Sequence, residues 1–178
     1  MEFNIEGYPS ADFIKMVLQV CPDQCTLVPD SPDQLTSDHG WNVVENRATL
    51  LGVLGDLREK NIRSSLFLDP DLEMLEQVPS VGADRIELYT EDYASNFARP
   101  EQDAVLERYR LTAQRTGQLG IGLNAGHDLD LQNLFKFLEI PNILEVSIGH
   151  ALVVESLQLG VAEVISRYLA IVDGEGIE

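Results

Sequence analysis

Long hydrophobic runs are absent from this chain of 178 residues, and no apolar segment approaches the ~20 residues that a helix needs to cross a bilayer. The first residues also lack the basic and then apolar pattern of a secretory signal peptide. We therefore expect no membrane partner.

Basic residues are scarce. Twelve Lys and Arg face thirty Asp and Glu, which gives a net charge of −18. A protein that binds nucleic acid needs a basic surface, so we expect no nucleic-acid partner. An anionic ligand would have to be held by local devices, such as backbone N–H groups at glycines and at helix N-termini.

Cysteine is also rare, because the chain has only Cys21 and Cys25. Two cysteines in a chain of this size make no disulfide framework, and their i, i+4 spacing is a weak metal signal. We interpret them as buried free thiols in a reducing compartment and expect no metal site. Walker A, Gly-x-Ser-x-Gly and Gly-rich dinucleotide motifs are missing as well.

What the sequence does contain is an unbroken alternation of strands and helices in one domain, residues 1–178. Strand-like segments cover residues 3–6, 25–29, 63–68, 85–90, 121–127 and 144–150. A first helix is expected to begin at residues 9–10. Further helix-like segments cover residues 43–60, 70–77, 100–119, 130–139 and 151–171, and loops are expected at residues 30–42 and 91–99.

Six βα units in uninterrupted order predict a parallel sheet with helices outside it. A TIM (β/α)8 barrel has eight such units and typically ~200 residues or more. We therefore expect a TIM (β/α)8-type barrel that is N-terminally truncated to about six βα units. The alternative is a doubly wound open sheet, which the missing dinucleotide motif does not support.

Two neighbouring strands end in the same dipeptide, Gly126-His127 and Gly149-His150. The carboxyl ends of parallel strands lie at the same edge of a sheet, where α/β proteins bind ligands. We expect the two histidines to lie side by side there. Gly149 also directly precedes a helix, so it is a candidate anion site, although packing alone also explains a glycine at this position.

Three carboxylates lie at or near the ends of other strands: Glu6, Asp69 and Glu87. Two carboxylates and a histidine at one barrel mouth are suited to general acid–base catalysis. Glu6 and Glu87 are equally consistent with structural roles, and Asp69 before Pro70 is predicted to cap a helix.

Six segments resemble the pyridoxine 5′-phosphate synthase family in order and spacing. They are residues 4–6, 26–30, 65–69, 86–90, 123–127 (Leu-Asn-Ala-Gly-His) and 147–151 (Ser-Ile-Gly-His-Ala), and they cover essentially the whole chain. The resemblance implies a TIM barrel enzyme of vitamin B6 synthesis. No spacing in the sequence implies a metal or an organic cofactor, so we expect none. The resemblance also implies a homo-oligomer, an octamer in the family, that is located in the cytoplasm.

The family condenses 1-deoxy-D-xylulose 5-phosphate with 3-amino-2-oxopropyl phosphate, and phosphate and water are released as the pyridine ring closes. The resemblance assigns the acid–base glutamate to Glu6, the proton-donating histidine to His127 and the carboxylate that stabilises the transition state to Glu87.

For phosphate binding, the resemblance points to Thr36, Gly149 and His150. It also points to Asp128, where many members have a glycine that touches a phosphate. An anionic side chain at this position must point away from the ligand, or the site is altered.

Two family segments, Asn-x-Asp-His and His-x-Arg, have no counterpart, and they belong to the two βα units that we expect to be missing. Two other interpretations therefore stay open: a non-catalytic remnant or interaction subunit, and another phosphate-binding barrel isomerase that uses Glu6 and His127.

We predict that the 178-residue chain alone is inactive, because the absent segments supply a general base and a phosphate-binding arginine in the family. Purified chain incubated with both substrate phosphates should release no pyridoxine 5′-phosphate. Product formation in this assay would contradict the prediction.

Overall fold

A computed structural model describes residues 2–30 and 38–174. The element order is β1 (Asn4–Gly7), α1 (Ala11–Val20), β2 (Gln24–Leu27), α2 (Arg47–Glu59), β3 (Arg63–Leu68), α3 (Leu72–Leu75), the 3-10 helix η1 (Val78–Ser80), β4 (Arg85–Tyr89), α4 (Glu91–Asn96), α5 (Gln102–Gln118), β5 (Gly122–Gly126), α6 (Leu134–Phe137), β6 (Ile143–Ser147), α7 (His150–Leu159) and α8 (Val161–Val172). Thr36 lies outside the described residues.

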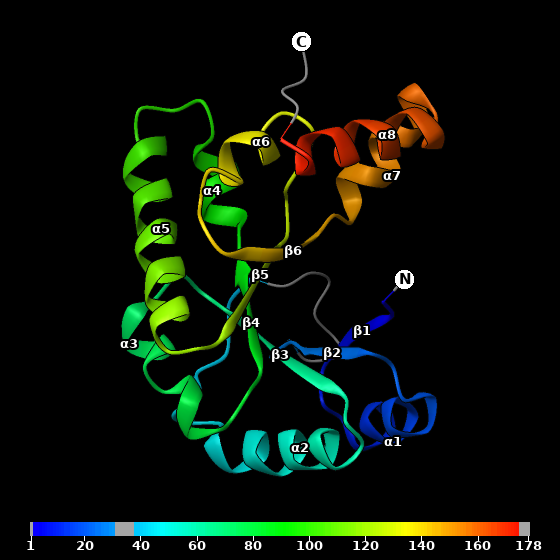
Figure 1. Ribbon diagram of the computed structural model, residues 1–178, viewed down its shortest axis with the longest axis vertical. Helices are drawn as coiled ribbons and strands as arrows, with labels where there is room; N and C mark the ends of the chain where they lie inside the picture. The colour runs from blue at the N-terminus through cyan, green and yellow to red at the C-terminus, as the bar shows by residue number, and fades with distance from the viewer. Residues whose placement is uncertain (1, 31–37, 175–178) are drawn as a thin grey trace.

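The six strands form one parallel sheet in chain order, from β1 to β6. The sheet is curled, and the helices lie around its outside (Figure 1). This is the α/β architecture that the alternating pattern predicts, and it is consistent with part of a TIM barrel. Among the described residues, no helix is both long and apolar enough to span a bilayer.

The beginning of α1 was predicted correctly, and a short helix does follow Pro70, but the residue predicted to cap it was wrong. The Ser10 hydroxyl accepts a hydrogen bond from the Phe13 N–H at the N-terminus of α1. At α3 the capping side chain is Asp71, which accepts from the N–H groups of Glu73 and Met74. The Asp69 carboxylate instead accepts from Gly40 N at 3.0 Å, so it anchors the loop before α2.

The segment predicted as a loop at residues 91–99 contains the helix α4. Glu91 and Asp92 lie in its first turn, where acidic side chains interact favourably with the helix dipole. Tyr93 is fully buried and anchors the helix to the core. Packing of this aromatic residue therefore stabilises a helix in a segment whose sequence is mostly polar.

Three further expectations need correction. The last helix is two helices, because Gly160 adopts φ +88° and interrupts the helical backbone. α6 is much shorter than residues 130–139, since Asp130 accepts hydrogen bonds from the N–H groups of Gln132 and Asn133 in a turn before the helix. Cys25 is a buried thiol as expected, but Cys21 is exposed.

The apolar core lies between the sheet and the helices. Alternate strand residues such as Leu66, Ile86 and Leu123 point outward into it and are buried. An aromatic cluster joins α4, α5 and α6, in which the rings of Tyr93 and Phe137 have centroids 5.0 Å apart. The strand positions that alternate with the core residues face the concave side of the sheet, and most of these are polar.

We predict that Phe137→Ala lowers the free energy of unfolding by about 3–5 kcal/mol, because it leaves a cavity in the aromatic cluster. Phe135→Ala in the same helix is the matched control, since Phe135 is 43% exposed whereas Phe137 is 0% exposed. Urea unfolding of both variants measures the difference. Equal destabilisation by the two variants would contradict this account of the core.

Candidate active site

The concave side of the sheet is organised in levels. In a TIM barrel, side chains from alternate strands meet at the same level of the interior. Here Thr26 of β2, Glu87 of β4 and Ser147 of β6 form one such level, and the hydroxyls of Thr26 and Ser147 hydrogen-bond the Glu87 carboxyl.

The level below is an ionic network that crosses the sheet. Gln24 Nε2 donates to Glu145 Oε1 at 3.1 Å, and Arg85 Nη1 lies 3.2 Å from Glu145 Oε2. Arg85 Nη1 also donates to Asn124 Oδ1 at 3.0 Å. Side chains of β2, β4, β5 and β6 are thereby joined across the concave side, which holds the sheet in its curled form.

A cleft of about 490 Å³ opens above these levels, at the carboxyl ends of the strands. It is lined by Asn4, Glu6, Phe67, Glu87, His127, Asp128, Ser147, Ile148, Gly149 and His150. The structure therefore brings together all the described residues that the sequence indicated as a site, including both histidines of the repeated Gly-His.

Glu87 lies at the bottom of the cleft and is 1% exposed. Its Oε2 lies 3.3 Å from Thr26 Oγ1. Burial raises the pKa of Glu87 to about 8, and the negative charge of Glu6 adds to the effect, whereas the hydrogen bonds from Ser147 and Thr26 oppose it. A carboxyl with such a pKa holds a proton in about half of the molecules or more near neutral pH.

Glu6 is more open to solvent than Glu87, yet the surrounding protein removes enough water from its carboxyl to raise its pKa as well. The charge of His127 lowers this pKa, and that of Asp30 raises it. The cleft therefore holds two carboxyls whose proton affinity is increased, which is typical of sites that perform proton transfer.

His127 and Asp128 have left-handed backbone conformations, with φ of +86° and +56°. Such conformations are unfavourable for residues other than glycine and often occur at functional sites. The turn is stabilised by Thr90, whose hydroxyl donates to the Gly126 carbonyl at 2.7 Å. The imidazole packs edge-on against Tyr89, with ring centroids 4.8 Å apart.

Asp128 does not point away from the site. Its Oδ2 lies 2.8 Å from His127 Nδ1, and its side chain lines the cleft. The carboxylate therefore contributes negative charge beside the histidine.

Gly149 is the N-cap residue of α7 and makes no side-chain cap, so the first N–H groups of this helix are available to a ligand. His150 is the first residue of α7, and both residues are exposed at the cleft. This end of the cleft is suited to an anion.

Four further residues line the cleft without having been expected there from the sequence: Asn4, Phe67, Ser147 and Ile148. The positions of Asn4 and Ser147 could have been predicted from the strand pattern. Asn4 precedes Glu6 by two residues and so faces the same side of β1, and Ser147 pairs in register with Gly126.

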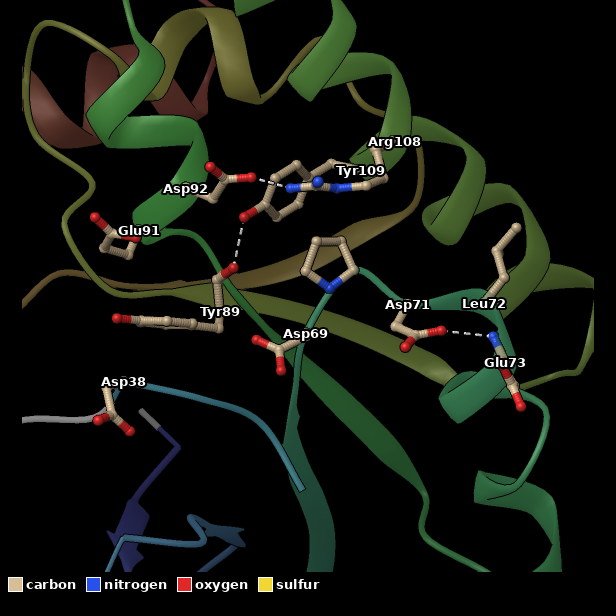
Figure 2. A pocket seen from close by; sticks show the side chains of 11 residues that line it. Asp38, Asp69, Asp71, Leu72, Glu73, Tyr89, Glu91, Asp92, Arg108 and Tyr109 are labelled. Carbon is tan, nitrogen blue, oxygen red and sulfur yellow. Dashed lines mark hydrogen bonds and ion pairs between the residues drawn. The ribbon is translucent and has the colours of Figure 1, made fainter. Parts of the chain in front are cut away.

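A larger cleft of about 700 Å³ lies on the β3–β4 side (Figure 2). Its lining includes Asp38, Asp69, Asp71, Glu73, Glu91 and Asp92, and its only described cation, Arg108, is paired with Asp92. This excess of negative charge makes the larger cleft a poor site for phosphates.

Among the described residues, one group has the composition of a metal site. Potential ligand atoms of Asp30, Asp38 and His39 lie within 4.8 Å of one another, and the His39 imidazole contacts the Asp38 carboxylate. Asp38 and His39 are exposed, and solvated charge explains the group without a metal ion.

The raised pKa of Glu87 gives a prediction for stability. Between the ordinary carboxyl pKa of 4.5 and the folded value of about 8, the folded chain holds a proton that the unfolded chain has released. Wild-type stability should therefore fall as pH rises through this window, by roughly 1 kcal/mol per pH unit.

The variant Glu87→Gln has no carboxyl to titrate at this position, so its stability should not fall in this way as pH rises. Its free energy of unfolding relative to wild type should therefore increase from pH 5 to pH 8. Urea unfolding across the pH range measures the difference. Glu139→Gln, at an exposed carboxylate paired with Lys136, is the control. If the stability of wild type and of Glu87→Gln changed with pH in the same way, the raised pKa of Glu87 would be refuted.

Comparison with solved structures agrees with the fold. The chain superimposes on the structure described as "Native KDPGal structure" with a TM-score of 0.59 and 9% identity, over 94% of this chain and 68% of the other. The structure of citrate synthase SbnG gives a TM-score of 0.56 and 12% identity, over 98% and 74%. At such identities the similarity concerns the fold alone.

Sequence relatives are much closer. The pyridoxine 5′-phosphate synthase of Chelativorans sp. (strain BNC1) is 47% identical over 173 residues, which are 95% of this chain and 70% of the relative. The enzyme of the same name from Bacteroides fragilis (strain YCH46) is 50% identical over 168 residues, 94% and 70% of the two chains.

The family model for "Pyridoxal phosphate biosynthesis protein PdxJ" matches residues 1–174. The relatives named above are transferase-type enzymes. With this match and this degree of identity, the chain belongs to the PdxJ family of pyridoxal phosphate biosynthesis enzymes.

Proposed function

We propose that this chain carries the acid–base site of a pyridoxine 5′-phosphate synthase. The reaction condenses 1-deoxy-D-xylulose 5-phosphate with 3-amino-2-oxopropyl phosphate to pyridoxine 5′-phosphate, phosphate and water. The observation that carries the proposal is one cleft in which Glu6, Glu87 and His127 come together, with the pKa of both carboxyls raised.

Ring closure of this kind requires repeated proton removal and return, since carbonyl condensation and loss of water both move protons. Glu6 is the proposed acid–base group, because a carboxyl with a raised pKa exchanges protons closer to neutral pH. His127 is the proposed proton donor to the departing oxygen. Glu87, when protonated, donates a hydrogen bond to charge that develops on the substrate.

The phosphate groups are proposed to bind at Gly149 and His150, because α7 begins at the cleft without a side-chain cap and a helix N-terminus favours an anion. Thr36 is proposed to contact the sugar phosphate. Such local capture is needed because the net charge of −18 repels anions at long range. No step in this scheme calls for a metal ion or an organic cofactor.

Self-association in the cytoplasm is part of the same proposal. α7 has no buried residue, and its exposed side chains include Val153, Val154 and Leu157. α8 adds Ile165 and Leu169 to this apolar surface. Apolar surfaces of this kind are typical of subunit contacts, so they support a homo-oligomer, with the octamer as the family form.

One observation favours a second candidate, a family member that has lost catalysis. The Asp128 carboxylate lies in the cleft wall, where its negative charge would repel a phosphate. Titration calorimetry with each substrate phosphate separates the candidates. Binding of both phosphates supports the synthase site, and binding of neither overturns it.

We predict that Asp128→Gly and Asp128→Asn both increase the affinity for the substrate phosphate, on the order of tenfold, because each removes one negative charge from the cleft. Glycine and asparagine both tolerate the φ of +56° at position 128, so neither substitution strains the backbone. Glu139→Gln, at an exposed carboxylate that does not line the cleft, controls for net charge. An unchanged dissociation constant in both Asp128 variants would show that Asp128 does not face the phosphate.

A further inference from the structure

The glycine before His127 leaves room for the Glu87 carboxyl, and any side chain at this position would have to displace that carboxyl. An ideal Cβ built on Gly126 would lie 2.3 Å from Glu87 Oε1 and 3.0 Å from the Ser147 Cβ. The φ of Gly126 is not positive, so the backbone itself would accept alanine. The reason for glycine is therefore space, and that space is filled by the Glu87 carboxyl.

The second carboxyl oxygen has a different environment. Glu87 Oε2 lies 3.3 Å from Thr26 Oγ1, and the Ser147 hydroxyl also hydrogen-bonds the carboxyl. The carboxyl is thus enclosed by three strands: β2 and β6 supply hydroxyls, and β5, which pairs with β4, supplies a surface without a side chain. We call Thr26, Gly126 and Ser147 the carboxyl pocket.

We propose that the carboxyl pocket positions Glu87, so that its carboxyl stays at the bottom of the cleft and faces Glu6. This inference rests on the proposed acid–base function for its catalytic meaning, but the geometry stands without it. The three are positioning residues, because they contact Glu87 and act through it.

An alternative partner for Glu87 is close in sequence, since Arg85 projects from the same face of β4. That arginine is engaged by Glu145 and Asn124 in the level below. Glu87 is thereby left with neutral hydroxyls, which stabilise a defined orientation of the carboxyl without placing a positive charge beside it. The charged groups around the carboxyl are Glu6 of β1, Arg85 of β4, Glu145 of β6, His127 and Asp128 after β5, and His150 of α7.

The first test is the titration of Glu87 followed by carboxyl carbon NMR of the whole chain. Ser147→Ala removes a hydrogen bond that favours the charged form, so the titration midpoint should rise by about one pH unit. Ser147→Thr keeps the hydroxyl and should restore the wild-type midpoint. Thr112→Val removes a buried hydroxyl that bonds a helix carbonyl in α5, and it is the matched control.

The second test is Gly126→Ala, in which the new Cβ should displace the Glu87 carboxyl and change both its chemical shift and its midpoint. Gly55→Ala is the control, because nothing lies within 4 Å of a Cβ at that position. If Ser147→Ala and Gly126→Ala both titrate as wild type, the carboxyl pocket is refuted.

These titrations need no substrate, so they are independent of the proposed function. Altered midpoints together with failure to bind either phosphate would support the carboxyl pocket and overturn the synthase site. Binding of both phosphates with unaltered midpoints would support the synthase site and overturn the carboxyl pocket.

Discussion

The site depends on the ionic network of Gln24, Arg85 and Glu145, because this network crosses the concave side of the sheet. A parallel sheet of six strands twists, and it can remain open or curl toward closure. Contacts from β2 and β4 to β6 favour the curled form. Only in that form do the ends of β1 and β6 approach each other, so that Glu6 and His150 line one cleft.

The electrostatics of the cleft follow from its position in an acidic chain. Burial raises the proton affinity of Glu87, and the negative charge of Glu6 adds to the effect. The same negative charge opposes phosphates, which makes the free N–H groups at the beginning of α7 essential to the proposed chemistry. The proposed acid–base groups and the proposed anion site therefore line the same cleft.

Much of this arrangement could be predicted from the sequence, because strand ends in a parallel sheet converge. The repeated Gly-His and the period-two placement of Asn4 and Glu6 are local signals of this kind. The helix α4 was missed because burial of Tyr93 overrides a polar local sequence. The carboxyl pocket also could not be predicted from the sequence, because the closeness of Gly126 to Glu87 depends on the register between β4 and β5.

The polar concave side also affects how stability varies with temperature. Exposure of apolar surface on unfolding increases the heat capacity, whereas exposure of polar surface decreases it. In many TIM barrels the interior is filled by branched apolar side chains, but here it contains residues such as Gln24, Ser65 and Asn124. The heat-capacity increment per residue should accordingly be small, and the stability curve of this protein should be broad and flat.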